Sequence, residues 1–264
     1  MAILTGALMY RGSFKSIRNY RNLYDSNTYA GEKGGANRDL ILHNPAFART
    51  RENMSEFGGC GAAVKAIRRG FQNLLPEQAD AHFTGRLMRL TKEINLRDTE
   101  GVRGRRSIFF SANRSILRNI VFNSRVNLSE MMQCCFSYSH SLSRDFANLS
   151  VMDLTINQAY VPEGATHFRI QHHLSIISDY VFSEGNGGYE ASCLINGLSA
   201  FGYSGFTPVL SALTSDISVS FPAGISLTDD CTVMQCIGVE FFIRSFGNVY
   251  LPLKGGCVKL TDVF

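Results

Sequence analysis

Hydrophobic positions between Asn44 and Phe71 repeat every three or four residues. Apolar or small side chains recur along one side of this stretch, at Phe47, Thr50, Met54, Phe57, Gly61, Val64, Ile67 and Phe71. This spacing predicts an amphipathic helix, and Asn44 followed by Pro45 is typical of a helix start. Each glycine in Gly58–Gly61 costs roughly 1 kcal/mol of helix stability relative to alanine. We therefore expect these glycines to allow close approach of a second helix.

The next segment supplies that partner. Pro76 is expected to start a second helix, whose inner face is lined by Phe83, Leu87, Leu90 and Ile94. The joint between the two helices is short, and short joints connect antiparallel neighbours. Residues 45–96 are thus predicted to form an α-hairpin. The following residues, 97–107, contain two glycines and four arginines, and this composition indicates a linker or an exposed loop.

The two flanking regions have β patterns. Residues 4–35 mix aromatic and polar side chains, which favours a hairpin with a turn near Gly12 or near 25–27. From residue 119 onward, short runs alternate with turn signals: NIVFN, DLTINQAYV, HFRIQHHLSII, DYVFSE, SDISVSF, TVMQCIGVEFFI and VYLPL. Within 233–243, alternate residues from Val233 to Ile243 are apolar except for Gln235, which predicts a strand with one buried face.

These elements predict an α+β chain. It comprises an N-terminal β-hairpin and an antiparallel α-hairpin, followed by a C-terminal antiparallel β-sandwich, Ig-like or jelly-roll-like, of about seven to nine strands. The predicted domains are 1–110 and 119–264. With 264 residues, of which 45% are hydrophobic, the chain is long enough to bury a sizeable core.

Charge is divided unevenly along the chain. Residues 1–122 carry a net charge of +10 and residues 123–264 a net charge of −6, giving +4 in total. This division is typical of parts with different partners, or of parts that attract each other between subunits. A basic, solvated helical surface is the alternative explanation.

The cysteines and the N-terminus bear on location. The seven cysteines have no repeated spacing, so we expect buried thiols and a reducing compartment rather than a disulfide framework. The apolar run at the N-terminus is too short for a signal peptide, and no window is long enough for a membrane-spanning helix. We expect synthesis in the cytoplasm. The sequence leaves the final location open, and an extracellular or phage-like assembly is one alternative.

No catalytic, metal or cofactor signature emerges. Gly58–Gly61 lacks the context of a nucleotide loop, and Ser204 lacks the second glycine of a nucleophile elbow. The histidines at 140, 167, 172 and 173 and the pair Cys134 and Cys135 lack the spacing of a zinc site. We therefore expect no enzyme, no metal and no cofactor.

Two groups of residues remain as candidates for binding. Lysines and arginines able to neutralise phosphates lie at the end of the first helix and in the linker, at Lys65, Arg68, Arg69, Arg103, Arg105 and Arg106. For the first three, compensation of the helix dipole is the alternative. Residues 191–215 carry no charge, which indicates either a crossover over the core or a patch buried against another subunit. The candidates for self-association in this segment are Leu194, Phe201, Tyr203 and Phe206.

Three strings resemble an uncharacterised protein family common in the Bacteroidota. They are EKGGANRDLILHNPAFARTRENMSEFG (32–58), EGATHFRI (163–170) and IGVEFFIRSFGNVYLPLKGG (237–256). The resemblance follows the same order over nearly the whole chain. It implies a hairpin and helices followed by a β-sandwich, and it provides no functional residues.

The resulting expectation is a non-enzymatic structural protein that self-associates into a filament, tube or phage-tail-like particle. Its partner would be another copy of the chain, without insertion into a membrane. The first alternative is nucleic-acid binding or packaging by the basic N-terminal half. The second is a surface- or glycan-binding β-sandwich, which the absence of tryptophan disfavours.

Overall fold

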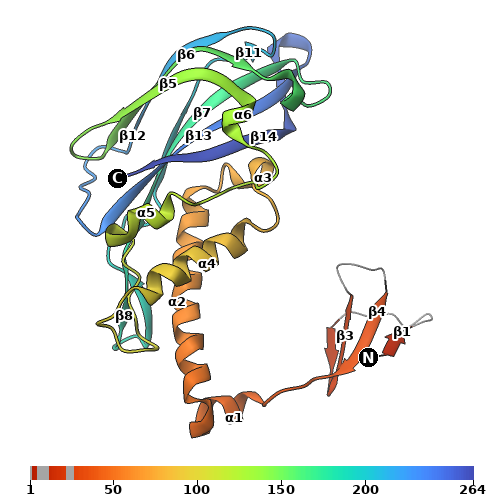
Figure 1. Ribbon diagram of the computed structural model, residues 1–264, viewed down its shortest axis with the longest axis vertical. Helices are drawn as coiled ribbons and strands as arrows, with labels where there is room; N and C mark the ends of the chain where they lie inside the picture. The colour runs from red at the N-terminus through yellow and green to blue at the C-terminus, as the bar shows by residue number, and fades with distance from the viewer. Residues whose placement is uncertain (1, 5–11, 22–26) are drawn as a thin grey trace. The chain divides into compact units, whose positions relative to one another are not determined.

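The computed structural model describes residues 2–4, 12–21 and 27–264, with the backbone alone at 2–4, 76, 77 and 134. Its contacts group into two compact units, Met1–Arg51 and Glu52–Phe264, which we call the N-terminal unit and the main unit. The protein mixes helix and sheet, with N-terminal strands and helices and a C-terminal antiparallel sheet region (Figure 1). The predicted division into 1–110 and 119–264 concerns independent folding and stays a prediction.

The N-terminal unit contains a small antiparallel sheet followed by short helical segments. The strands, in the order β1-β4-β3-β2, are β1 (Ala2–Leu4), β2 (Gly12–Phe14), β3 (Ile17–Arg21) and β4 (Thr28–Glu32). Helix α1 (Arg38–His43) and the 3-10 turn η1 (Pro45–Phe47) follow. The turn between β2 and β3 is made by Lys15 and Ser16, and Lys15 adopts a positive φ of 51° there. Gly12 lies in β2, where it pairs with Asn19. The other predicted turn, at 25–27, begins outside the described residues.

Three helices begin the main unit or lead into it: α2 (Ala48–Gly70), α3 (Leu75–Gln78) and α4 (Phe83–Leu96). The predicted inner face of the second helix is confirmed, because its four apolar residues are all buried. The predicted continuous helix from Pro76 is wrong, since the chain leaves the helix after Gln78. There Asp80 accepts a hydrogen bond from the N–H of His82 (2.9 Å) and pairs with Arg86 (2.9 Å), which favours a fresh helix start.

The glycines of α2 have a different role from the one predicted. A Cβ atom on Gly59 would lie 2.4 Å from the ring of Tyr189, which belongs to β9 (Gly188–Ala191) and not to α4. Gly61 does face α4, where Met88 lies 3.8 Å from the corresponding Cβ position, and Gly58 faces open space. Within Gly58–Gly61, the close approach that excludes a side chain is therefore between α2 and the ring of Tyr189.

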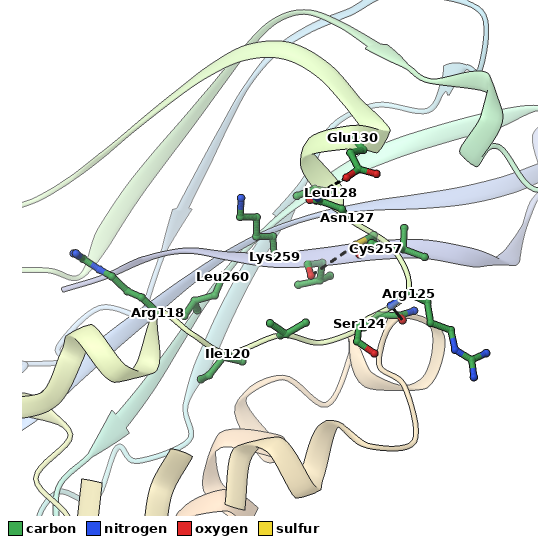
Figure 2. Close-up of a pocket in the computed structure, with 14 residues that line it drawn as sticks. Arg118, Ile120, Ser124, Arg125, Asn127, Leu128, Glu130, Cys257, Lys259 and Leu260 are labelled. Carbon is green, nitrogen blue, oxygen red and sulfur yellow. Dashed lines mark hydrogen bonds between the residues drawn. The ribbon is translucent and has the colours of Figure 1, made fainter. Parts of the chain in front are cut away.

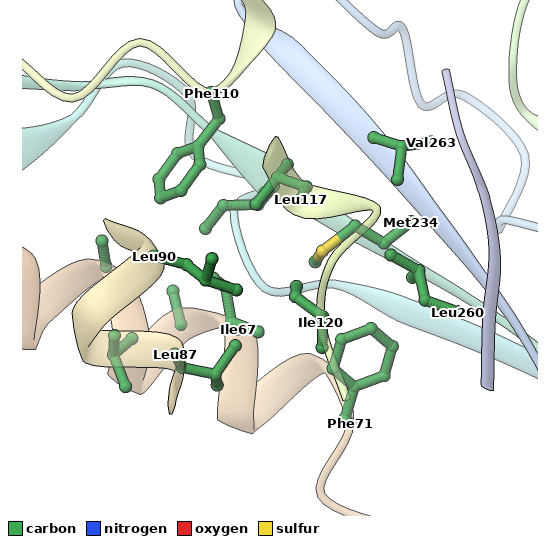
Figure 3. Packing of buried hydrophobic residues seen from close by; sticks show 14 of the residues in the cluster. Ile67, Phe71, Leu87, Leu90, Phe110, Leu117, Ile120, Met234, Leu260 and Val263 are labelled. Carbon is green, nitrogen blue, oxygen red and sulfur yellow. The ribbon is translucent and has the colours of Figure 1, made fainter. Parts of the chain in front are cut away.

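The central sheet has the strand order β10-β7-β13-β14, with β11 also paired to β7. Its strands are β7 (His167–Ser178), β10 (Ser199–Tyr203), β11 (Thr207–Pro208), β13 (Cys231–Arg244) and β14 (Tyr250–Val263). One face packs on the helices. Figure 3 shows Ile67 of α2, Phe71 of the turn that follows it and Leu87 of α4 in one buried cluster with Met234 and Leu260 of this sheet.

The other face of the central sheet shares its core with a second sheet. That sheet has the order β12-β6-β5 and consists of β12 (Leu213–Ser220), β6 (Phe146–Ile156) and β5 (Met132–His140). Leu149 and Val151 of β6 belong to the same buried cluster as Ile170, Val239 and Phe241 of the central sheet. The prediction that β13 buries a single face is therefore wrong. Its odd positions contact the second sheet and its even positions, such as Met234, contact the helices.

Short elements complete the main unit. They are η2 (Ser111–Asn113), α5 (Arg114–Leu117), α6 (Leu128–Met131), η3 (Gln158–Tyr160), β8 (Tyr180–Ser183), which pairs with β9, and η4 (Phe246–Asn248). The run 119–123, expected to be a strand, makes a single bridge between Val121 and Lys259. Among the helices of the described residues, none is both long and apolar enough to cross a bilayer.

Candidate interaction surface

Five aromatic residues gather at one part of the central sheet, and we call them the aromatic face: Phe201, Tyr203, Phe206, Phe242 and Tyr250. The ring centroids of Phe201 and Tyr203 are 5.5 Å apart. Phe206 stacks on Tyr250 at 3.8 Å and meets Phe242 edge-on at 4.9 Å. The rings thus form two groups, Phe201 with Tyr203 and Phe206 with Phe242 and Tyr250, and Arg169 contacts rings of both.

Strand register explains why these rings share a face. Tyr203 pairs with Gln171 of β7, and Phe242 pairs with His167, four residues away on the same strand. Directly paired residues, and residues two apart, project to the same side of a sheet. This is also the side that receives α2, because His173 is hydrogen-bonded to the carbonyl of Gly70 at the end of that helix (2.7 Å).

The aromatic face is open to solvent. Phe201 is 46% exposed, Tyr203 37% and Phe206 38%, whereas Phe242 is buried beneath them. Exposed apolar side chains that adjoin one another form a contiguous patch, and covering such a patch removes apolar area from water and is favourable. A partly covered aromatic group on a sheet is therefore a candidate for contact with another molecule.

Arg169 of β7 lies in the middle of the aromatic face. Its guanidinium group is 3.8 Å from the ring centroid of Tyr203, 5.0 Å from that of Phe242 and 5.5 Å from that of Phe206. It also pairs with Glu240 at 2.6 Å. The rings and the carboxylate hold the guanidinium in place and balance its charge.

The structure brings together three of the four residues predicted for self-association. Leu194 is fully exposed in the loop before β10 and lines a different hollow, of about 410 Å³, together with Arg69 and Ile195. Sequence reasoning missed Arg169, Phe242 and Tyr250. The parity of β13 places Phe242 and Glu240 on the same face, but no sequence signal relates that face to Tyr203.

The arginines of the linker are already engaged. Arg103 pairs with Glu52 at 3.3 Å, Arg105 pairs with Glu184, and Arg106 lies 3.8 Å from Glu56. Each of these arginines is thus partly neutralised by a carboxylate of the same chain. A phosphate would have to compete with these contacts, which weakens the linker as a nucleic-acid site.

The three basic residues of α2 differ from one another. Lys65 and Arg68 are exposed. Arg69 donates a hydrogen bond to the carbonyl of Asn196 and lies against Gly197, where a Cβ atom would be 2.7 Å from its Nη2. Arg69 therefore joins the end of α2 to the loop before β10, a structural role that the helix pattern alone could not show.

Figure 2 shows a pocket of about 430 Å³ beside β14, with Arg118, Arg125 and Lys259 at its rim. Arg118 pairs with Asp262 (3.1 Å), and Lys259 contacts the hydroxyl of Ser129 (3.0 Å). Burial raises the pKa of the Cys257 thiol to about 11, so this cysteine stays protonated near neutral pH. The pocket therefore has cations at its rim and a protonated thiol in its lining.

The histidines weighed as metal ligands have structural contacts. Nδ1 of His172 lies 2.9 Å from the carbonyl of Ile217, on the face opposite to His173. Burial lowers the pKa of both histidines, to about 4 for His173. Within the part of the chain that the structure describes, no group of three or more His, Cys, Asp or Glu residues could hold a metal ion. Ser204 accepts the N–H of Ile170 (2.9 Å) and so also has a structural role.

Comparison with protein-family models, with curated proteins and with solved structures found no match to this chain. The resemblance of 32–58, 163–170 and 237–256 to a Bacteroidota family therefore stays a prediction.

Proposed function

We propose that the chain is a non-enzymatic structural protein that self-associates through the aromatic face into an ordered assembly such as a filament, a tube or a phage-tail-like particle. We further propose that its two antiparallel sheets form a β-sandwich of the Ig-like or jelly-roll-like kind. The observation that carries the functional proposal is the half-exposed group of Phe201, Tyr203 and Phe206 around Arg169.

Aromatic rings and arginine are the side chains that contribute most at protein interfaces. In this face the guanidinium of Arg169 is already held by Tyr203, Phe206 and Glu240. Association then costs little further side-chain entropy, because the group is largely fixed beforehand. The charge-free segment 191–215 supports the same conclusion, since it includes three of the five rings and brings no charged side chain to be desolvated.

The test is a double substitution, Phe201→Asp with Phe206→Asp. We expect a folded monomer by light scattering and no ordered particles by negative-stain electron microscopy, in high salt and after nuclease treatment. Val102→Asp is the matched control, because Val102 is 74% exposed and lies outside the aromatic face. A double variant that assembles like the wild type would refute the proposal.

Nucleic-acid binding by the basic N-terminal half is the second candidate. Lys65 and Arg68 favour it because both are exposed cations at the end of α2, although Arg103, Arg105 and Arg106 are each near a carboxylate. Phosphate binding weakens steeply with salt, whereas an apolar interface persists. Particles that dissolve at high salt or on nuclease treatment would therefore favour this candidate. A glycan- or surface-binding role ranks third.

A further inference from the structure

The sheet of the N-terminal unit buries little apolar surface among the side chains that the structure describes. Among its described side chains, at 12–21 and 27–51, no hydrophobic residue is buried, and the buried residues are the polar Asn19 and Thr28. A sheet is stable in water when at least one of its faces is packed against another layer. The described part of this unit thus lacks a covering layer.

Two exposed apolar side chains of this sheet lie at the tip of the β2–β3 hairpin. Phe14 is 62% exposed and Ile17 44% exposed, and the two are directly paired across the strands. Their side chains therefore project together from one face. Lys15 lies between them in the chain, with its Nζ atom 5.8 Å from the Phe14 ring, and Arg18 lies over the ring of Tyr20 at 5.7 Å.

Charge indicates the kind of partner. Residues 1–51 contain eight Lys or Arg and three Asp or Glu, a net charge of +5, whereas residues 123–264 have a net charge of −6. Opposite charges of this size attract the N-terminal unit of one copy to the sheet region of another. A second copy is therefore a partner that matches both the charge and the apolar tip.

We propose that the N-terminal unit is an assembly arm whose β2–β3 hairpin docks on the aromatic face of a second copy. This inference rests on the proposed function, because the acceptor is the same face. Phe14 and Ile17 would cover the rings of Phe201 and Tyr203, and Lys15 would meet the negative face of an aromatic ring. Arm and acceptor are different surfaces, so the contact is head-to-tail and propagates into a ring or an open filament.

The experiment uses full-length variants with one surface disabled at a time. The arm variant carries Phe14→Asp with Ile17→Asp, and the face variant carries Phe201→Asp with Phe206→Asp. Neither Phe14 nor Ile17 is buried, so the main unit should keep its fold, which circular dichroism checks. Each variant alone should be monomeric by light scattering, whereas Val102→Asp should assemble like the wild type.

Mixing the two variants in equal amounts gives the decisive result. The arm variant keeps an intact acceptor, and the face variant keeps an intact arm, so one productive contact forms per pair. We expect the mixture to give dimers that do not grow further. A mixture that stays monomeric, while each variant alone is monomeric, would overturn the head-to-tail contact.

Other outcomes separate this inference from the proposed function. If the arm variant assembles normally while the face variant does not, the arm is refuted and the aromatic face still mediates association. If both variants assemble normally, both proposals are wrong. If the arm variant assembles normally but loses retention on DNA, the basic arm binds nucleic acid and the inference is overturned.

Discussion

The buried carboxylate of Glu56 gives the sharpest test of the packing described above. Glu56 is only 1% exposed, on α2. It pairs with Lys92 of α4, accepts the N–H of Gly104 (2.8 Å) and lies 3.8 Å from Arg106. One carboxylate therefore joins both helices to the arginine-rich loop. Replacing it by glutamine keeps the shape and removes the charge.

Removing one partner of a buried ion pair costs about 3–5 kcal/mol of the free energy of unfolding. The cost should be smaller here, because the side chain of Lys92 is 26% exposed and glutamine can still accept the N–H of Gly104. We expect Glu56→Gln to lower the free energy of unfolding by about 2–3 kcal/mol. At roughly 2–4 °C per kcal/mol for a chain of this size, Tm should fall by roughly 5–10 °C.

Urea unfolding followed by circular dichroism measures this change. Glu93→Gln is the matched control, because Glu93 forms an exposed pair with Arg97 (3.6 Å), and such pairs contribute about 0.5 kcal/mol or less. Equal stabilities of the Glu56→Gln and Glu93→Gln proteins would refute the anchoring role of Glu56.

The pH dependence provides an independent check. Burial acts to raise the pKa of Glu56, but the hydrogen bonds from Lys92 and Gly104 and the charge of Arg106 outweigh it and lower the pKa below its usual value of 4.5. A lowered carboxyl pKa contributes stability above the unfolded pKa, and that stability is lost as the pH falls through the folded pKa. The difference between wild type and Glu56→Gln should therefore be full at pH 7 and shrink below about pH 4.5.

Three further predictions follow from buried or exposed groups. Gly59→Ala should cost about 2 kcal/mol in urea unfolding, because its Cβ would overlap the ring of Tyr189; a neutral result would show that the ring can move. Burial lowers the pKa of His173 to about 4, so between about pH 6.5 and 4 the unfolded chain binds more protons at this residue than the folded chain does. The free energy of unfolding should therefore decrease as the pH falls from about 6.5 to 4. His173→Gln, which can still donate to Gly70, should reduce that slope, and an unchanged slope would contradict it. Cys135 is the exposed thiol among the described cysteines, so native protein should react with a thiol reagent there before it reacts at the buried Cys60, Cys231, Cys236 and Cys257, as peptide mapping would show.

The helix and strand predictions succeeded where one periodicity governed the element. The spacing from Phe83 to Ile94 is helical, and those residues form the buried face of α4. The break before α4 was missed because hydrophobic spacing does not report a local hydrogen bond such as that of Asp80. The odd-numbered residues of β13 alternate as in a strand with one buried face. The even-numbered Met234 and Cys236 are also apolar, and both are buried against the helices. A nearly continuous apolar run is typical of a strand that is covered on both sides.

The candidate surface was predictable only in part. Phe201, Tyr203 and Phe206 stand close together in one uncharged segment, so composition was enough to indicate them. Phe242 and Tyr250 come from other strands, and the register that places them beside Phe206 follows from long-range pairing. Local sequence does not encode that register unless a turn fixes it.

The two-sided burial of β13 has a consequence for the nascent chain. Helices α2 and α4 are made early, but the residues that cover them, including Met234, Val258 and Leu260, come from the last two strands. Ribosomes add about 5–20 residues per second, so the apolar side of α2 waits roughly 10–40 s for its cover during translation. Over that interval the helices are substrates for chaperones that hold exposed hydrophobic segments. Codon changes that slow translation between α4 and β13 should increase co-translational aggregation more than equally slow codons placed before α2.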